Sequence, residues 1–166
     1  NIENACITGE GGAQFPAHIK YDVKDKRIKN LILNGAECEP YLTCDYTLMK
    51  EYTRELFDGI KIICEILKPE NIILAIDEKY SALESEFQKY NTDNVKILTV
   101  SDIYPQGSEQ LLINSILNKE IPKSKLPLEE GFIVSNVGTV KAVYEAFIYG
   151  KPLVERIVTI SGEKSG

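Results

Sequence analysis

The stretch that decides the fold runs from position 30 to position 43 and reads Asn30-Leu31-Ile32-Leu33-Asn34-Gly35-Ala36-Glu37-Cys38-Glu39-Pro40-Tyr41-Leu42-Thr43. Its first four residues include three consecutive large apolar side chains, which predict a buried strand. The Asn-Gly-Ala that follows predicts the turn that ends this strand. Beyond the turn, apolar side chains recur every three or four positions over residues 45–67, which predicts a helix with one buried face that Pro69 stops. The chain therefore builds a strand, an acidic turn and a helix in succession.

The same alternation continues through the rest of the chain. Apolar runs predict further strands at residues 71–76, 95–100, 132–134 and 154–160. Amphipathic patterns predict helices at residues 80–90 and 109–117, the latter with Ser108 as N-cap, and a third helix that follows residues 136–139 and continues through Phe147. Residues 119–131 are predicted to form a loop. Because strands and helices alternate about four times, we expect an α/β fold, a Rossmann-like three-layer domain with a mostly parallel sheet. Ligands of such sheets bind where strands end and helices begin.

Composition restricts the classes of function. The chain has 166 residues, 43% of them hydrophobic, with 19 basic and 25 acidic side chains and a formal net charge of −6. This length predicts one domain, the acidic balance argues against a nucleic-acid-binding surface, and no apolar run reaches the roughly 20 residues that span a bilayer. Residues 1–8 are short and polar and predict no signal peptide. From the two ends we expect a fragment of a longer protein, with one domain at residues 1–162 and the start of a linker at 163–166.

The cysteines and the histidine argue against a metal centre within this chain. Cys6, Cys38, Cys44 and Cys64 form no C-x-x-C, ferredoxin-like or zinc-ribbon pattern, and the chain has one histidine, His18. We therefore expect reduced, buried or half-buried thiols and no iron–sulfur cluster within these residues.

A glycine-rich segment near the start of the chain is the first candidate for ligand binding. Gly9, Gly11 and Gly12 precede Phe15 and Lys20. The segment is not a dinucleotide fingerprint, because the third glycine position holds glutamine and no strand is predicted before it. A tight turn is the simpler interpretation of such a cluster. Glycine backbone can also pack against a flat ring, an aromatic side chain can stack on a second ring, and a lysine can meet a phosphate or a ring carbonyl, which together suit a flavin with a nucleotide.

Two further turns carry polar side chains at predicted strand ends. Glu37 and Glu39 place two acids in one turn, which fits a general acid and base, a metal site, acceptors for ribose hydroxyls, or a solvated acidic turn. Asn136 and Thr139 lie at a predicted helix start, where free backbone N–H groups and the helix dipole favour a phosphate. A plain helix cap is the alternative there.

Taken in order, segments 9–20, 34–43, 104–109 and 136–139 resemble RnfC, a component of the Rnf electron-transport complex, and, more distantly, the FMN-binding 51-kDa subunit of respiratory complex I. The string at residues 34–43 is highly specific to the Rnf side, and the resemblance extends over residues 6–162. It implies an α/β domain of the complex I 51-kDa FMN-binding type. The implied activity is hydride exchange between NAD(H) and FMN, which feeds electrons to iron–sulfur or other acceptors.

The resemblance also implies roles for individual residues. Those implied to bind FMN are Gly9, Gly11, Gly12, Lys20, Asn34, Glu37, Gly107, Asn136 and Thr139, the last two at the phosphate. Those implied to bind NADH are Phe15, which would stack on adenine, and Glu39 and Glu109, which would accept hydrogen bonds from ribose hydroxyls. Acids at the ribose would repel a 2′-phosphate, which favours NADH over NADPH. No catalytic side chain and no metal ligand are expected, because the flavin itself takes the hydride.

The implied partners are NAD(H) and the other proteins of an electron-transfer complex, with no nucleic acid and no membrane span in this chain. The implied location is the cytoplasm or, through partner proteins, the inner face of the cell membrane, and iron–sulfur clusters are expected only in a further C-terminal region. An alternative from another class is an electron-relay or scaffold protein, such as the RnfC-like proteins of cobalamin or proline reductase systems, that keeps the fold without binding NADH or flavin. Ala17 favours this alternative, because the family pattern has a threonine there whose hydroxyl would belong to the nucleotide wall.

Overall fold

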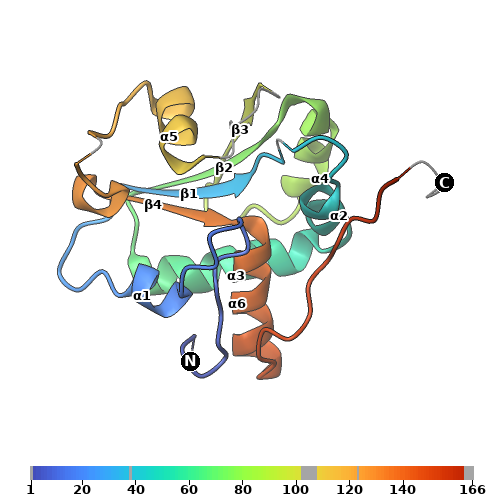
Figure 1. The fold of residues 1–166 in the computed structure, drawn as a ribbon, viewed down its shortest axis with the longest axis horizontal. Coiled ribbons are helices and arrows are strands. Elements are labelled where there is room, and N and C mark those ends of the chain that lie inside the picture. Colours follow the sequence, from blue (N-terminus) through green and yellow to red (C-terminus); the bar gives the residue numbers. More distant parts are fainter. Residues whose placement is uncertain (1, 38, 102–107, 123, 163–166) are drawn as a thin grey trace.

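The computed structural model describes residues 2–37, 39–101, 108–122 and 124–162. Within these residues, one sheet of four parallel strands forms the centre of the molecule (Figure 1). Its order is β3-β2-β1-β4, and the strands are β1 (Asn30–Gly35), β2 (Asn71–Asp77), β3 (Lys96–Val100) and β4 (Phe132–Asn136). The predicted parallel sheet is therefore confirmed, and each of the first four predicted strands is found within two residues of its expected bounds.

The order in which strands are added to the sheet reverses between β1 and β4, although the two strands run parallel. From β1 the chain proceeds to β2 and β3 on one side, and then returns to add β4 on the other side of β1. In open parallel sheets, the connections on the two sides of such a point diverge and leave a crevice beyond the carboxyl ends of the strands. Asn34 on β1 lies directly opposite Asn136 on β4 at this edge.

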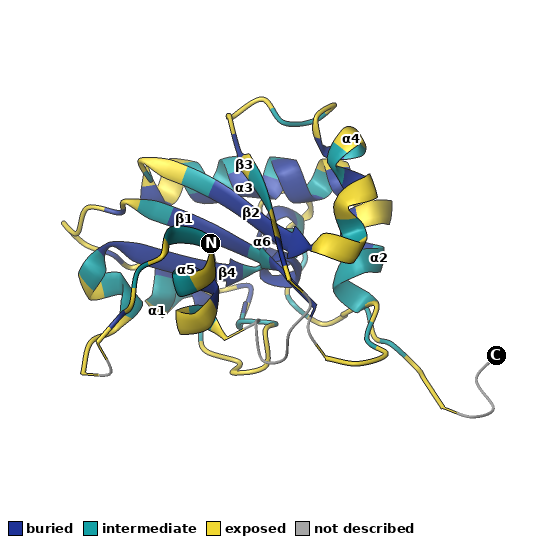
Figure 2. Cartoon of the chain, turned by 90° about the horizontal axis from the view of Figure 1, so that it is seen from above, coloured by how far each residue is buried: buried dark blue, intermediate teal, exposed yellow. Residues whose placement is uncertain are grey.

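Helices cover both faces of the sheet, which makes the three predicted layers. On one face lie α1 (Ala17–Tyr21), α2 (Cys44–Glu51), α3 (Thr53–Leu67) and α6 (Val137–Tyr149), and on the other lies α5 (Glu109–Leu117). Successive residues of β1 supply the two cores in turn: Leu31 and Leu33 pack with α3 and α6, whereas Ile32 packs with α5. Figure 2 shows most of β1, β2 and β4 as buried, whereas the edge strand β3 is largely exposed or intermediate.

A glycine lets α3 and α6 approach each other closely. A Cβ atom at Gly59 would lie 2.6 Å from the backbone oxygen of Val140, so no larger residue fits without a shift of one helix. This contact between the two helices helps to hold α6 in position. The position of α6 matters for the crevice, because α6 begins at the carboxyl end of β4, where the crevice lies.

Two predicted helices have different boundaries in the structure. The helix expected over residues 45–67 is interrupted at Tyr52, so that α2 and α3 are separate. The Thr53 hydroxyl donates a hydrogen bond to the Met49 carbonyl oxygen (2.7 Å), and such side-chain bonds compete with the helical ladder. The segment predicted as one helix at 80–90 is a 3₁₀-helix, η1 (Glu78–Leu83), followed by the single turn α4 (Glu84–Phe87).

The prediction of a last strand at residues 154–160 is wrong. The segment is extended, but within the described part of the chain it pairs with no strand. It runs along α6 toward α2 instead, with Leu153 N–H donating to the Ala5 carbonyl oxygen (3.0 Å) and Thr43 N–H donating to Thr159 Oγ1 (2.9 Å). Its alternating apolar side chains include Val154 and Ile160, which are exposed, so the alternation reflects no sheet face.

Smaller differences concern segments that carried weak signals. The helix α1 follows Pro16 and was not expected, although proline is common just before a first helical turn. The loop predicted at 119–131 contains a 3₁₀ turn, η2 (Pro127–Glu130).

Cys44 and Cys64 are half-buried free thiols as expected, Cys6 is exposed, and Cys38 lies outside the described residues. No helix in the described part of the chain is long and apolar enough to cross a membrane.

Candidate functional site

A hollow lies at the carboxyl ends of β1 and β4, where the strand order reverses. It has an inner part and an outer part, with a volume of about 450 Å³ for the outer part, and both parts are lined by Gly11, Asn34 and Asn136. We refer to the two parts together as the switch-point hollow. The inner part is also lined by the predicted residues Gly9, Phe15, Lys20, Glu109 and Thr139, and the outer part by Gly12, Glu37 and Glu39. The four segments singled out from the sequence therefore meet at one place, apart from Gly107, which lies outside the described residues.

The glycine segment forms a compact loop that presents its backbone to the hollow. Its ends are joined by a bridge between Thr8 and Pro16, and Gly9 N–H donates to the Phe15 carbonyl oxygen (2.8 Å). Gly12 has φ +104°, a conformation that other residues rarely adopt. Phe15 is 49% exposed, so its side chain is accessible to a ligand. Such a wall of backbone beside an available aromatic ring fits a flat heterocycle.

The start of α6 forms the second wall. Asn136 is the N-cap: its Oδ1 accepts a hydrogen bond from Gly138 N–H (2.7 Å), and its Nδ2 donates to Asp45 Oδ2 (2.9 Å). The Thr139 hydroxyl accepts a hydrogen bond from the Glu10 N–H (2.9 Å), which ties the glycine loop to the helix. The remaining N–H groups of the first turn have no partner within the helix, and the helix dipole makes this end favourable for an anion.

A close approach explains the glycine at position 138. A Cβ atom there would lie 2.9 Å from both Asn136 Oδ1 and Glu10 Oε2, so a larger residue would disturb the cap and the loop together.

An ion pair crosses the inner part of the hollow. Lys20 Nζ on α1 lies 2.5 Å from Glu109 Oε1 on α5, and both side chains are partly exposed. The resemblance assigned Lys20 to the flavin and Glu109 to the nucleotide. The residue expected at the flavin and the residue expected at the nucleotide are therefore in direct contact.

The two acids of the turn, Glu37 and Glu39, differ in burial. Glu37 is buried, and its Oε1 accepts hydrogen bonds from the Cys44 thiol (3.0 Å) and Asp45 N–H (3.1 Å), so it neutralises the start of α2. Glu39 is exposed and lines the outer hollow. Only Glu39 of this pair therefore has a carboxylate free to meet a ligand directly.

Glu37 also belongs to the one group of candidate metal ligands found among the described residues. Oxygen and sulfur atoms of Glu37, Cys44 and Asp45 lie within 4.8 Å of one another. Glu37 is already engaged by the donors at the start of α2, and burial raises the pKa of the Cys44 thiol to about 12. The thiolate that a metal requires is therefore disfavoured, and we assign no metal to this group.

Sequence reasoning missed Asp45, which lines the outer part of the hollow. Burial raises the pKa of its carboxyl to about 6; the Asn136 hydrogen bond and the Arg156 charge oppose this rise, whereas the Glu37 and Glu10 charges add to it. Arg156 was missed as well, because its segment was predicted to be a strand. No local pattern marks either residue, since both reach the hollow only through the fold.

The lining of the inner hollow contains a contact that the sequence did not predict. The Tyr21 hydroxyl and Ser135 Oγ lie 2.6 Å apart, both residues are buried, and both line the hollow. The bond connects α1 to β4 beneath the glycine loop. Burial raises the pKa of Tyr21 to about 12, so its hydroxyl stays protonated at neutral pH.

The fold is that of a doubly wound α/β domain, and the hollow lies at its topological switch point, where ligands of such sheets bind. Residues 2–145 match the family model described as the Nuo51 FMN-binding domain. The chain belongs to this family. The expected class, an oxidoreductase domain of electron transport related to the complex I 51-kDa protein and to RnfC, is thereby confirmed.

Curated relatives match nearly the whole chain. The subunit designated C of the proton-translocating ferredoxin:NAD(+) oxidoreductase complex of Clostridium ljungdahlii is 42% identical over 163 residues, which are 97% of this chain and 36% of the relative. The subunit designated C of the ion-translocating oxidoreductase complex of Actinobacillus succinogenes is 39% identical over 167 residues, covering 98% of this chain and 24% of the relative. The chain thus spans about a quarter to a third of the length of these relatives.

Solved structures share the fold. An NAD+-reducing [NiFe]-hydrogenase in the H2-reduced state matches with a TM-score of 0.77 and 24% identity, over 86% of this chain and 29% of the hydrogenase chain. The air-oxidized state matches with a TM-score of 0.76 and 25% identity, over 87% and 29%. These likenesses confirm the predicted fold class.

Proposed function

We propose that this chain binds FMN in the switch-point hollow and exchanges hydride between NAD(H) and FMN, as a module of an RnfC-like protein. One observation carries the proposal: the segments predicted to bind FMN and NADH are far apart in the sequence, yet they line one hollow at the strand reversal. The relatives support the nicotinamide substrate, because one belongs to a ferredoxin:NAD(+) oxidoreductase complex and another is an NAD+-reducing hydrogenase.

The residues of the hollow fit FMN. A Cβ atom added at Gly11 would be in ordinary van der Waals contact with the Asn136 Cβ (3.5 Å), so the glycine loop adjoins the start of α6, and its backbone would border the ring. Asn136, Thr139 and the first N–H groups of α6 would hold the phosphate, and Asn136 also caps the helix start. Asn34 and Lys20 would face the polar part of the flavin. Bound FMN would supply the hydride acceptor, and the protein needs no acid–base residue for this step.

The nucleotide side of the hollow would bind NADH. Phe15 offers its exposed ring to adenine, and the carboxylates of Glu39 and Glu109 would accept hydrogen bonds from ribose hydroxyls. The role of these residues is to stack and orient the nicotinamide toward the flavin, which is the main contribution a protein makes to hydride transfer. Because both carboxylates would repel a 2′-phosphate, the proposal favours NADH over NADPH.

The relatives also suggest where the electrons go. Both curated relatives are parts of larger redox complexes, so we propose that this domain passes electrons to iron–sulfur or other acceptors on partner proteins or on a further region of a longer protein. Attachment to the inner face of the cell membrane would then come through those partners.

An anaerobic titration tests the proposal. Protein reconstituted with FMN is mixed with NADH, and the visible flavin absorbance is followed. We expect NADH to bleach it at far lower concentration than NADPH. A bound flavin that NADH never bleaches would instead favour the electron-relay alternative, and protein that retains no FMN would contradict the cofactor assignment.

A further inference from the structure

The outer part of the switch-point hollow is markedly acidic. The carboxylates of Glu10, Glu37, Glu39 and Asp45 all line it. Bringing the phosphate of FMN, which carries close to two negative charges, beside several carboxylates is unfavourable unless a cation is present. Among the described residues, Arg156 is the only basic side chain that lines this part of the hollow.

The C-terminal segment places Arg156 there. Backbone and side-chain hydrogen bonds hold this segment on both sides of the arginine, from Leu153 to Ala5 (3.0 Å) and from Thr43 to Thr159 (2.9 Å). The arginine also lines a small adjoining depression with Gly138 and Lys141, so it lies near the start of α6.

The guanidinium of Arg156 acts on the acids of the hollow through space. Burial raises the pKa of Glu10, and the Arg156 charge partly opposes that rise, as it does for Asp45. In the part of the chain that the structure describes, Arg156 forms no ion pair within 4.0 Å and no hydrogen bond from its side chain. Its five N–H donors are therefore available to another partner.

We propose that Arg156 is a cofactor-binding residue that pairs with the phosphate group of FMN at the start of α6. This inference rests on the proposed function. A guanidinium binds phosphate in a two-pronged geometry, and it adds the positive charge that the acidic wall lacks. It also implies that the extended C-terminal segment is part of the flavin site and not a passive tail.

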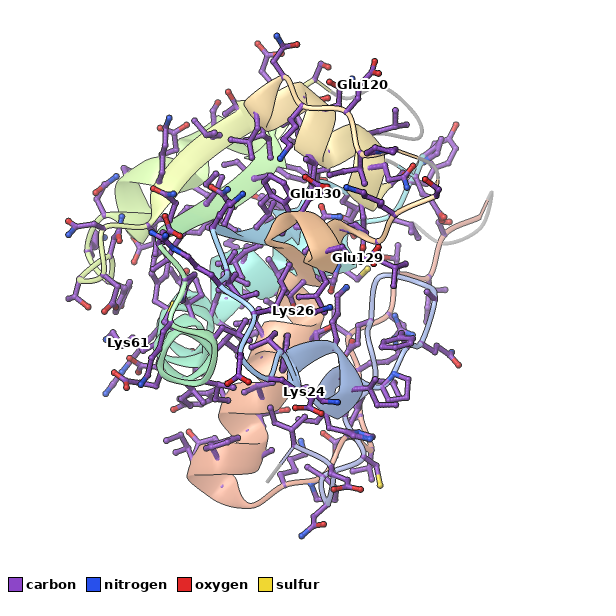
Figure 3. The ribbon with its side chains drawn as sticks, turned by 90° about the vertical axis from the view of Figure 1, so that its left-hand side faces the viewer. Lys24, Lys26, Lys61, Glu120, Glu129 and Glu130 are labelled. Atoms are coloured by element: carbon purple, nitrogen blue, oxygen red, sulfur yellow. The ribbon has the colours of Figure 1, made fainter. Side chains whose placement is uncertain are left out.

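The test compares FMN with riboflavin, which has the same ring system without the phosphate. Affinities are measured by quenching of flavin fluorescence for the wild type, Arg156→Ala and Arg156→Lys. Arg27→Ala is the matched control, because Arg27 is an exposed arginine that pairs with Glu70 near Lys26, at the end where the strands begin (Figure 3). Thermal unfolding verifies that every variant is folded.

We expect Arg156→Ala to weaken FMN binding by about tenfold or more while riboflavin binding stays unchanged, since a bond to a charged group is lost. Arg156→Lys should lie between, and Arg27→Ala should match the wild type. Unchanged FMN binding in Arg156→Ala, or an equal loss for FMN and riboflavin, would overturn the inference and leave the proposed function standing. A folded wild type that binds neither flavin would refute the proposed function itself, and the inference with it.

Discussion

Asn136 illustrates how one side chain can serve both the fold and the site. Its amide oxygen caps α6 through Gly138 N–H, and its amide nitrogen donates to Asp45. The plain helix cap and the phosphate site, which the sequence left as alternatives, are therefore compatible, because the cap holds the helix start at which a phosphate would bind.

We expect Asn136→Ala to lower FMN retention by about 1.5–3 kcal/mol, the range for a hydrogen bond to a charged group. The measurement is flavin occupancy after gel filtration. The matched control is Asn71→Ala, which removes a side-chain hydrogen bond to Lys29 at the opposite end of the sheet. Equal occupancy in both variants would remove Asn136 from the flavin site.

Glu39 carries the prediction for the acidic turn, because Glu37 is buried at the start of α2. Glu39 is exposed at the outer hollow, so Glu39→Gln should weaken NADH binding while FMN binding changes little. Separate titrations with FMN and with NADH measure this, with Glu129→Gln on the far side of the molecule as the control (Figure 3). A loss of the same size for both ligands would contradict the assigned role.

Asp45 predicts a specific pH dependence of stability. The folded-state pKa of its carboxyl is raised from 3.8 to about 6 by burial first, with Glu37 and Glu10 adding to the rise and Asn136 and Arg156 opposing it. A raised acid binds its proton more tightly in the folded state than in the unfolded state. The ionisation of Asp45 therefore costs no stability below about pH 4 and destabilises the fold progressively as the pH rises through 6.

Asp45→Asn keeps the shape and can still accept the Asn136 hydrogen bond, but it cannot ionise. We therefore expect the free energy of unfolding of the variant, relative to that of the wild type, to increase by up to about 3 kcal/mol as the pH rises from about 4 to about 7.5. Urea unfolding of both proteins at the two pH values measures this gain. A stability difference that does not change with pH would show that Asp45 does not titrate in this range.

At the scale of elements, sequence patterns predicted what one segment decides by itself. The buried strands β1, β2 and β4 are short runs of apolar residues and were found where expected. The break at Tyr52 depends on a hydroxyl that bonds to the preceding turn, and the extended segment at 154–160 depends on which strand, if any, lies beside it. Periodicity describes one element and contains no information about its partner.

For Gly59→Ala, the packing of the two helices predicts the opposite sign of stability change from helix propensity. Alanine at an exposed helical position stabilises by about 1 kcal/mol relative to glycine. At Gly59, however, the added Cβ would lie 2.6 Å from the Val140 carbonyl oxygen, so Gly59→Ala should destabilise by about 1–3 kcal/mol through overpacking. Chemical denaturation measures it, and a variant as stable as the wild type would mean that α3 and α6 are not held at this separation.

At the scale of the whole molecule, the topology assembles the site. The order β3-β2-β1-β4 sets β1 and β4 side by side, which brings the acidic turn after β1 and the start of α6 together beneath the glycine loop. The resemblance predicted the residues of this site because it preserves their order. It could not predict Asp45, Tyr21 or Arg156, whose positions depend on helix packing and on the path of the C-terminal segment.

The excess of acidic residues also has a local meaning. Four carboxylates gather at the outer hollow, whereas the end of the molecule where the strands begin carries lysines and glutamates together (Figure 3). A hollow of this charge disfavours polyanions such as nucleic acid, and its helix start and its arginine would allow a single phosphate.

The most direct test of the proposed cofactor site is the crystal structure of the protein with FMN bound. We expect the flavin ring along the backbone of residues 9–12, between the ends of β1 and β4, and the phosphate at the first turn of α6. Flavin density at any other surface, with the switch-point hollow left open, would contradict the central claim that this hollow is the cofactor site.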